Sequence, residues 1–186
     1  APLGLSNSVF NPRQKRPETT RYAATELQGN TRDGRVTFEN VRTYTLSGEV
    51  HDEKAYYSMQ GVAGHAGLFS TAGELARLTQ LLLNGGGLGE HYLFSETVLN
   101  QFILPSAISD TTGLGFRRAA NGERRWQFGP YASERTFGHT GWTGTLSVVD
   151  PEHDLVIILL TNKRHTPIQQ AIDAKGNIAM PFNSKG

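Results

Sequence analysis

Residues 137–145 carry the side chains in this chain that are best suited to chemistry. The stretch reads Phe-Gly-His-Thr-Gly-Trp-Thr-Gly-Thr, so it places an imidazole and several hydroxyls among three glycines. The apolar residues that follow predict a strand, and glycines at the mouth of a strand indicate that a ligand or another backbone comes close. A peptide laid along that strand would pair with its exposed N–H and C=O groups. The pattern predicts a peptide-binding edge and favours an enzyme.

The rest of the chain shows no self-sufficient nucleophile and no metal site. It has no cysteine, no Gly-x-Ser-x-Gly elbow and no serine followed three residues later by lysine. The six histidines lack the His-Glu-x-x-His spacing of a zinc site. The glycine run at residues 85–87 follows an expected helix, so it ends that helix and does not cradle a phosphate. The sequence therefore predicts no cofactor and no metal.

Composition and the chain ends bear on the expected partners and on whether the chain is part of a longer protein. The 186 residues carry a formal net charge of +1, which gives no reason to expect nucleic acid as a partner. No apolar run approaches the length of a membrane span, so membrane attachment is not visible in this chain. The chain opens without Met or a signal-like segment and closes on a polar tail, and we expect it to be part of a longer protein.

The elements that position residues 137–145 follow in a simple order. Residues 1–70 are loop-rich, with a hint of a strand at 35–38, and we expect them to border an active-site cleft. A helix begins after Thr71, which with Glu74 forms a capping box, and it ends in the glycine run. A second helix begins at Ser95 and stops before Pro105; its expected buried side consists of Val98, Leu99, Phe102 and Ile103.

Antiparallel strands are expected over residues 112–162. Residues 113–117 and 125–128, separated by Asn121-Gly122, predict one hairpin. A second hairpin pairs the strand after residue 145 with the run 155–160 across the turn 150–154, and its residues 156–160 are expected to be core. Residues 163–186 form a polar tail. Loops, then helices, then strands favour an α+β fold in a single domain spanning residues 1–186.

The stretch His139-Thr140-Gly141 resembles the third motif of the penicillin-binding and serine β-lactamase superfamily, in its class C-like branch. Two further parts of the chain resemble the same family in the same order: residues 1–5, and the glycine-rich loop 61–72 with the helix that follows it. The resemblance implies a β-lactamase/transpeptidase-like fold, an antiparallel sheet with flanking helices. It also implies that the domain is incomplete, because the family's Ser-x-x-Lys and tyrosine motifs would precede Ala1.

The resemblance assigns roles to particular residues. A serine forms an acyl-enzyme, and the oxyanion is held by two backbone N–H groups, one of which belongs to Trp142. Gly141 leaves room for the substrate beside the strand. His139 tunes the proton network, and Thr140 orients the substrate carboxylate. Thr143, His65 and Ala66 complete the expected substrate-binding set, with Glu26 and residues 49–52 as weaker neighbours of the cleft.

Plain structural alternatives remain for each of these residues. The glycines could be strand kinks, Trp142 a packing residue, His139 a surface strand residue and His65 a hydrogen-bonded loop histidine. For the function, we expect part of a periplasmic serine hydrolase acting on D-alanyl peptides or β-lactams. An esterase on the same fold and a non-catalytic peptide-binding relative are the alternatives. The expected partners are the peptide or β-lactam and the missing N-terminal part of the domain.

Overall fold

The computed structural model describes residues 2–18, 21–32, 34–105, 107, 109–120, 125–165, 171–172 and 178–179. The chain divides into two compact units. The first comprises residues 1–8 and 70–161, and the second comprises residues 9–69 and 162–186. The first unit contains the stretch at 137–145, and the second contains residues 61–69 of the glycine-rich loop.

The centre of the first unit is an antiparallel sheet with the strand order β10-β9-β8-β7. Its strands are β7 (Arg117–Arg118), β8 (Phe137–Thr140), β9 (Leu146–Asp150) and β10 (Leu155–Leu159). The predicted hairpin of β9 and β10 across the turn 150–154 is confirmed, with Leu155 opposite Asp150 and Leu159 opposite Leu146. The glycine-rich stretch before β9 proves to be a strand of its own, because residues 137–140 pair with residues 146–149. β8 therefore lies inside the sheet, between β9 and β7.

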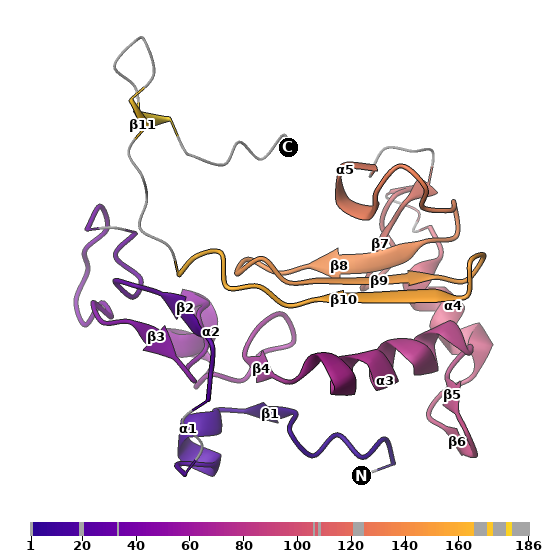
Figure 1. Cartoon of the computed structure of the whole chain (residues 1–186), viewed down its shortest axis with the longest axis horizontal. Helices are drawn as coiled ribbons and strands as arrows, with labels where there is room; N and C mark the ends of the chain where they lie inside the picture. Colours follow the sequence, from indigo (N-terminus) through magenta and orange to yellow (C-terminus); the bar gives the residue numbers. More distant parts are fainter. Residues whose placement is uncertain are drawn as a thin grey trace. The chain divides into compact units, whose positions relative to one another are not determined.

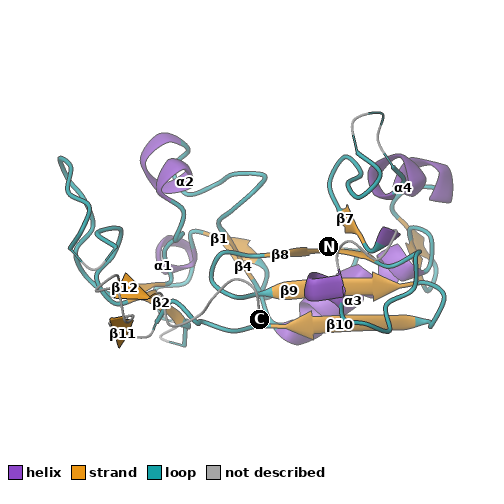
Figure 2. Cartoon of the chain, turned by 90° about the horizontal axis from the view of Figure 1, so that it is seen from above, coloured by secondary structure: helices purple, strands orange, loops and turns teal. Residues whose placement is uncertain are grey.

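Helix α3 (Ala72–Leu83) packs on β9 and β10 and follows the predicted bounds (Figures 1 and 2). Thr71 accepts a hydrogen bond from the Glu74 backbone N–H, as an N-cap should. At the other end the N–H of Gly86 bonds to the carbonyl of Leu81, and the N–H of Gly85 to that of Leu82. This double pattern is a Schellman motif, and it explains why the glycine run ends the helix.

Only half of the predicted capping box is observed, because the side chain of Glu74 bonds to residues 6–8 and not to the Thr71 N–H. Its carboxylate accepts hydrogen bonds from the N–H of Asn7 at 2.6 Å and the hydroxyl of Ser8 at 2.7 Å. Burial alone would raise the pKa of Glu74, but the hydrogen bonds from Ser8, Asn7 and Ser6 outweigh it and hold the pKa below its usual value. The ionised carboxylate thus fastens residues 6–8 to the start of α3.

Helix α4 (Glu96–Ile103) confirms the second predicted helix, with Ser95 as its N-cap. It follows a small hairpin of β5 (Gly87–Leu88) and β6 (His91–Tyr92). The predicted buried side is only partly right. Leu99 is buried, but Val98 and Phe102 are 41% and 45% exposed.

The predicted hairpin of residues 113–117 and 125–128 is wrong. Residues 125–128 form the short helix α5 (Arg125–Phe128), and β7 pairs with β8 instead, with Arg117 opposite Gly138. Asn121 and Gly122, the predicted turn, lie outside the described residues. A side chain at Gly138 would meet the carbonyl of Ser147 on β9 and the ring of Phe128 on α5. The absence of a side chain there lets α5 and β9 close on β8, which local sequence patterns do not reveal.

Strand β10, at one edge of the sheet, is covered on one face only. Leu155, Ile157 and Leu159 on β10 are 44%, 42% and 48% exposed, whereas the alternate residues Val156 and Ile158 are partly covered. Alternation of this kind marks a strand with one packed face, and α3 is the element that packs on β10. The prediction of a fully buried run was wrong because the opposite face of β10 has no cover in the described part of this unit.

The second unit is loop-rich, as predicted, and its strands are short. β1 (Val9–Phe10) pairs with β4 (Leu68–Phe69), β2 (Ala24–Glu26) with β3 (Leu46–Ser47), and β11 (Ala171–Ile172) with β12 (Ile178–Ala179). Its helices are α1 (Pro12–Lys15) and α2 (Glu53–Ser58). The hinted strand at 35–38 is absent, because the Val36 N–H bonds back to Thr31 in a turn. Most of the predicted polar tail lies outside the described residues.

Replacing Gly138 by alanine tests the close approach of β8 to β9. The new methyl group must displace the backbone of Ser147, so we expect the free energy of unfolding to fall by about 1–3 kcal/mol. Denaturant unfolding measures this loss. Gly73 in α3 is the matched control, because nothing lies within 4 Å of the place its side chain would take. Gly73→Ala should be neutral or stabilising by up to about 1 kcal/mol. Equal effects at the two positions would contradict this account of Gly138.

Candidate active site

Residues 141–145 join β8 to β9, and Trp142, Thr143 and Gly144 form the turn at their centre. The N–H of Gly141 donates to the carbonyl of Thr145 at 2.8 Å, and the N–H of Gly144 donates to the carbonyl of Gly141 at 3.0 Å. Gly144 has φ of +98°, which suits the last position of such a hairpin loop and disfavours other residues. A side chain at Gly141 would meet the hydroxyl of Thr145. Both glycines are therefore needed to turn the chain tightly at the end of the motif.

His139 and Thr140 point to opposite faces of the sheet, because they are consecutive residues of a strand. The imidazole of His139 is exposed, and its Nδ1 lies 2.7 Å from the carbonyl oxygen of Thr140. A carbonyl can only accept, so Nδ1 carries the proton in this contact. In the neutral ring Nε2 then holds the free lone pair. His139 can accept a proton at Nε2 on its face of the sheet.

Thr140 lies beside a cation that the sequence did not point to. The Arg117 guanidinium donates to the Thr140 hydroxyl at 3.3 Å and to the Gln127 side-chain oxygen at 3.3 Å. Arg117 stands opposite Gly138, and strand alternation places it on the same face as Thr140. Among the described residues no carboxylate forms an ion pair with Arg117. The arrangement can bind an anion next to the motif threonine.

Sequence reasoning missed Arg117 and Gln127 for an identifiable reason. The contact depends on the pairing of β7 with β8 and on the helical turn of α5, and both were predicted differently. The two arginines at 117 and 118 read alike in the sequence. Only the register of the sheet separates them, because Arg118 stands opposite Phe137 and turns to the other face.

Trp142 and Thr143 occupy the loop beyond the sheet ladder. The side chain of Trp142 is 61% exposed. Thr143 is half-buried. Because Trp142 lies in the loop, its N–H does not belong to a strand ladder. The role of that N–H in holding an oxyanion stays a prediction.

His65 and Ala66 belong to the second unit. The Nε2 of His65 lies 3.2 Å from a carboxylate oxygen of Asp52, which also caps α2 by accepting from the Ala55 N–H. Burial would raise the pKa of Asp52, but the hydrogen bonds from Ala55 and His65 hold it below the usual value. The carbonyl of Ala66 accepts from the Ala63 N–H and closes the loop. His65 is thus an oriented, half-exposed histidine, and its predicted contact with substrate stays a prediction.

The weaker candidates near His65 have structural partners. His51 is largely buried, and its ring lies 4.0 Å from the Glu26 carboxylate. Burial, against the raising effect of Glu53, lowers the pKa of His51, so the ring is neutral near pH 7. Glu49 accepts a hydrogen bond from Tyr44 and lies 3.6 Å from the Arg42 guanidinium.

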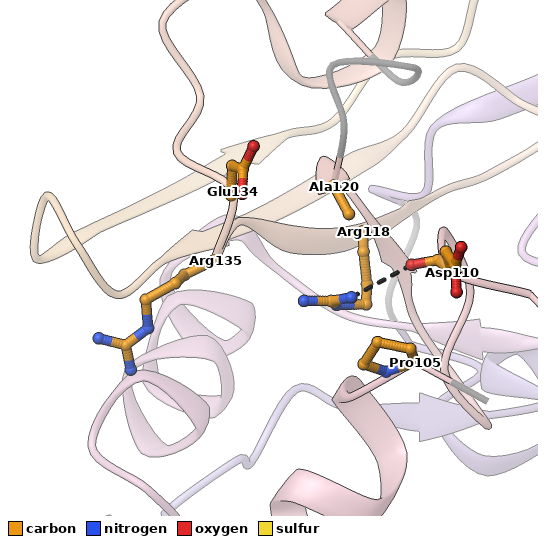
Figure 3. A pocket seen from close by; sticks show the side chains of 6 residues that line it. All are labelled: Pro105, Asp110, Arg118, Ala120, Glu134 and Arg135. Carbon is orange, nitrogen blue, oxygen red and sulfur yellow. Dashed lines mark hydrogen bonds between the residues drawn. The ribbon is translucent and has the colours of Figure 1, made fainter. Parts of the chain in front are cut away.

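A hollow of about 370 Å³ lies on the first unit, away from the motif (Figure 3). It is lined by Pro105, Asp110, Arg118, Ala120, Glu134 and Arg135. Glu134 and Arg135 precede β8, whereas His139 and Thr140 end it, so the hollow borders the opposite end of the strand. Arg118 donates to the carbonyl of Asp110 there and has a structural partner.

The described residues contain no group of three or more histidines and carboxylates placed to hold a metal ion. No helix among them is long and apolar enough to cross a bilayer.

A buried carboxylate holds the start of β8 in place. Asp150, 3% exposed at the end of β9, accepts from the Ser133 hydroxyl at 2.6 Å, the Thr136 hydroxyl at 2.7 Å and the His153 ring at 2.9 Å. Burial would raise the pKa of Asp150, but these bonds and the Ser133 N–H outweigh it and depress the pKa well below its usual range. Because Thr136 directly precedes β8, Asp150 fixes the segment that enters the motif strand.

Comparison with known proteins decides the family. The family model described as Beta-lactamase matches residues 1–178 of the chain. The chain belongs to the Beta-lactamase family. This membership confirms the predicted β-lactamase-like α+β fold, and it agrees with the antiparallel sheet and its flanking helix.

Two relatives of this Beta-lactamase family chain carry different names. An N-acetylmuramyl-L-alanine amidase of Bacillus subtilis is 53% identical over 167 residues, and a protein of Escherichia coli K12 provisionally named D-alanyl-D-alanine carboxypeptidase is 52% identical. Each match covers 90% of this chain but only 38% of the relative. A crystal structure of a penicillin-binding protein homologue from Caulobacter crescentus, 27% identical, covers 52% of this chain and 27% of its own, with a TM-score of 0.42.

Replacing Asp150 by asparagine should loosen the entry to β8. The substitution removes hydrogen bonds to a buried charge, so we expect about 2 kcal/mol less unfolding free energy at pH 7. The carboxylate has a lower pKa folded than unfolded, so its contribution is complete above the unfolded value of about 3.9 and is lost progressively as the pH falls from there through the much lower folded pKa. Denaturant unfolding from about pH 2 to 8 should show the difference between the two proteins begin to shrink below about pH 4.

Asp154→Asn is the control for this substitution. Asp154 lies in the same turn, is exposed and has φ of +48°, a conformation that asparagine also accepts. Its substitution should leave the pH dependence of stability unchanged. A similar loss of acid dependence in both variants would show that Asp150 is not the group responsible.

Proposed function

We propose that this chain is the substrate-binding part of a serine hydrolase that acts on cell-wall peptides through an acyl-enzyme. The observation that carries the proposal is the contact of Thr140 with Arg117 on one face of the motif strand, with His139 on the other. In this arrangement Thr140 and Arg117 hold a substrate carboxylate. A role of His139 in proton transfer follows from the family resemblance and is a separate proposal, because its side chain lies on the other face of β8. The Trp142 N–H holds the developing oxyanion. No metal or cofactor is needed for these steps.

The position of Arg117 favours one substrate class over its rivals. In a D-alanyl-D-alanine peptide or a penicillin a free carboxylate lies close to the bond that is attacked. In the bond named for the Bacillus relative, between N-acetylmuramic acid and L-alanine, the peptide continues beyond it. A simple ester offers no anion at all. An arginine whose guanidinium lies beside Thr140 is of most use to the first class, so we place the protein with the D-alanine carboxypeptidases.

We propose that the nucleophile comes from residues other than these 186, in which no serine has a lysine three residues on. We propose that an upstream part of the same domain supplies the serine, its lysine and a tyrosine. The chain spans 38% of the length of its relatives, which leaves room for such a part. The uncovered apolar face of β10 is a surface on which it can pack. We propose that the complete protein works in the periplasm, where cell-wall peptides occur.

The 186-residue chain alone should therefore not hydrolyse a chromogenic β-lactam. Joined to the preceding part of the Bacillus relative, it should gain saturable turnover and release D-alanine from a D-alanyl-D-alanine peptide. Absorbance and D-alanine assays measure the two reactions, and N-acetylmuramyl-L-alanine and an aryl ester complete the substrate set. Turnover by the isolated chain would refute the proposal that another part of the protein supplies the nucleophile. A joined protein that releases L-alanine and no D-alanine would favour an amidase. Cleavage of the ester alone would favour an esterase, and no cleavage of any substrate would favour a binding module.

Arg117→Ala in the joined protein tests the anion-binding contact. We expect kcat/KM for the D-alanyl-D-alanine peptide to fall about 10- to 100-fold, because a charged hydrogen bond to the substrate is lost. The same peptide with an amidated C-terminus should be affected much less. Arg118→Ala is the matched control, because Arg118 turns to the opposite face and bonds to the carbonyl of Asp110. An equal loss for the free and the amidated peptide would contradict a carboxylate-binding role for Arg117.

A further inference from the structure

Gln127 on α5 has a buried side-chain amide whose oxygen is hydrogen-bonded and whose nitrogen is not. The residue is 8% exposed, and its Oε1 accepts a hydrogen bond from the Arg117 guanidinium at 3.3 Å. Its Nε2 is buried and has no hydrogen-bond partner among the described residues. Buried amide donors nearly always have a partner, so an unpartnered one calls for an explanation.

Exchanging the oxygen and nitrogen of the Gln127 amide by a half-turn of the group does not give the unpaired nitrogen a partner. An arginine guanidinium has donors only, so the atom of Gln127 that faces Arg117 must be the oxygen. Exchanging the oxygen and the nitrogen would set two donors against each other and leave the oxygen without its partner. The orientation of the amide is therefore fixed by Arg117, and the unused N–H groups are fixed with it.

The surroundings of Nε2 define what would satisfy it. The Arg117 guanidinium has no acidic partner among the described residues, and its contacts to Gln127 and Thr140 are both long, at 3.3 Å. A half-buried cation, an unused amide N–H and a hydroxyl thus lie together on one face of β8. Two neighbouring groups that only donate are complementary to a group that only accepts, and a carboxylate supplies two acceptor oxygens.

We propose that Gln127 is a ligand-binding residue, whose Nε2 donates a hydrogen bond to an oxygen of the carboxylate that Arg117 binds. Gln127 then has two roles. Its oxygen orients the guanidinium, and its nitrogen recognises the anion. The proposal deepens the proposed function by adding a specificity-determining residue from α5. It concerns binding and needs no catalytic serine, so it can be tested on the chain as it stands.

The test uses N-acetyl-D-alanine as a small carboxylate probe, titrated into the ¹⁵N-labelled 186-residue chain. The side-chain amide resonance of Gln127 should move and saturate, whereas N-acetyl-D-alanine amide, which has no carboxylate, should leave it in place. Gln127→Glu keeps an oxygen toward Arg117 but replaces the donor by a second acceptor. We expect it to weaken binding of the probe at least tenfold and to leave thermal stability equal or higher.

Gln101→Glu, an exposed change of the same kind on α4, is the control and should bind the probe like the unmodified chain. A Gln127→Glu chain that binds the probe normally would overturn the proposal. So would a Gln127 resonance that ignores the probe, as it would if a buried water satisfied the amide. The two failures remain distinguishable. Loss of turnover in the joined protein leaves this binding result standing, and failure of the titration leaves acylation by a serine untouched.

Discussion

The pairing of β8 with β9 on one side and β7 on the other determines where the candidate groups lie. β8 can enter this position because Gly138 has no side chain, so that the Ser147 backbone and the Phe128 ring approach it closely. The register then places Arg117 and Thr140 on one face and His139 on the other. A shift by one residue would exchange the faces and separate the arginine from the threonine. The positions of the candidate reactive side chains therefore depend on the close approach of the Gly138 and Ser147 backbones.

Several charged groups among the described residues lie in closed hydrogen-bond networks, and Arg117 does not. Asp150 and Glu74 are surrounded by donors from nearby turns, and both pKa values are held low. Arg42 in the second unit bonds to Asn30 and to the carbonyls of residues 50 and 51, and its guanidinium lies 3.7 Å from the Tyr56 ring. Such closed networks hold loops in place. Arg117, with two long contacts and no acidic partner among the described residues, stands apart from them as a group suited to a ligand.

Local patterns predicted the elements whose ends are determined by nearby residues. Thr71 and the glycine run determine where α3 begins and ends, and the turn at 150–154 separates two strands of the right length. The failures have a common cause. Residues 125–128 alternate like a strand but form a helix over Gly138, and residues 156–160 read as buried but have one uncovered face. In both cases the outcome depends on which distant element packs there, and a local pattern contains no information on that.

The sequence by itself determined the family resemblance, the α+β class, the principal helix and the motif at 139–141, because these depend on residue types and short spacings. It also showed that no serine-lysine pair is present in these 186 residues. Only the tertiary structure decided that β7 pairs with β8, that Arg117 and not Arg118 reaches Thr140, and that Gln127 is buried beside it. The physical reason is that a strand alternates its faces. Which of two adjacent arginines serves the site is settled by register alone, and register is a property of the assembled sheet.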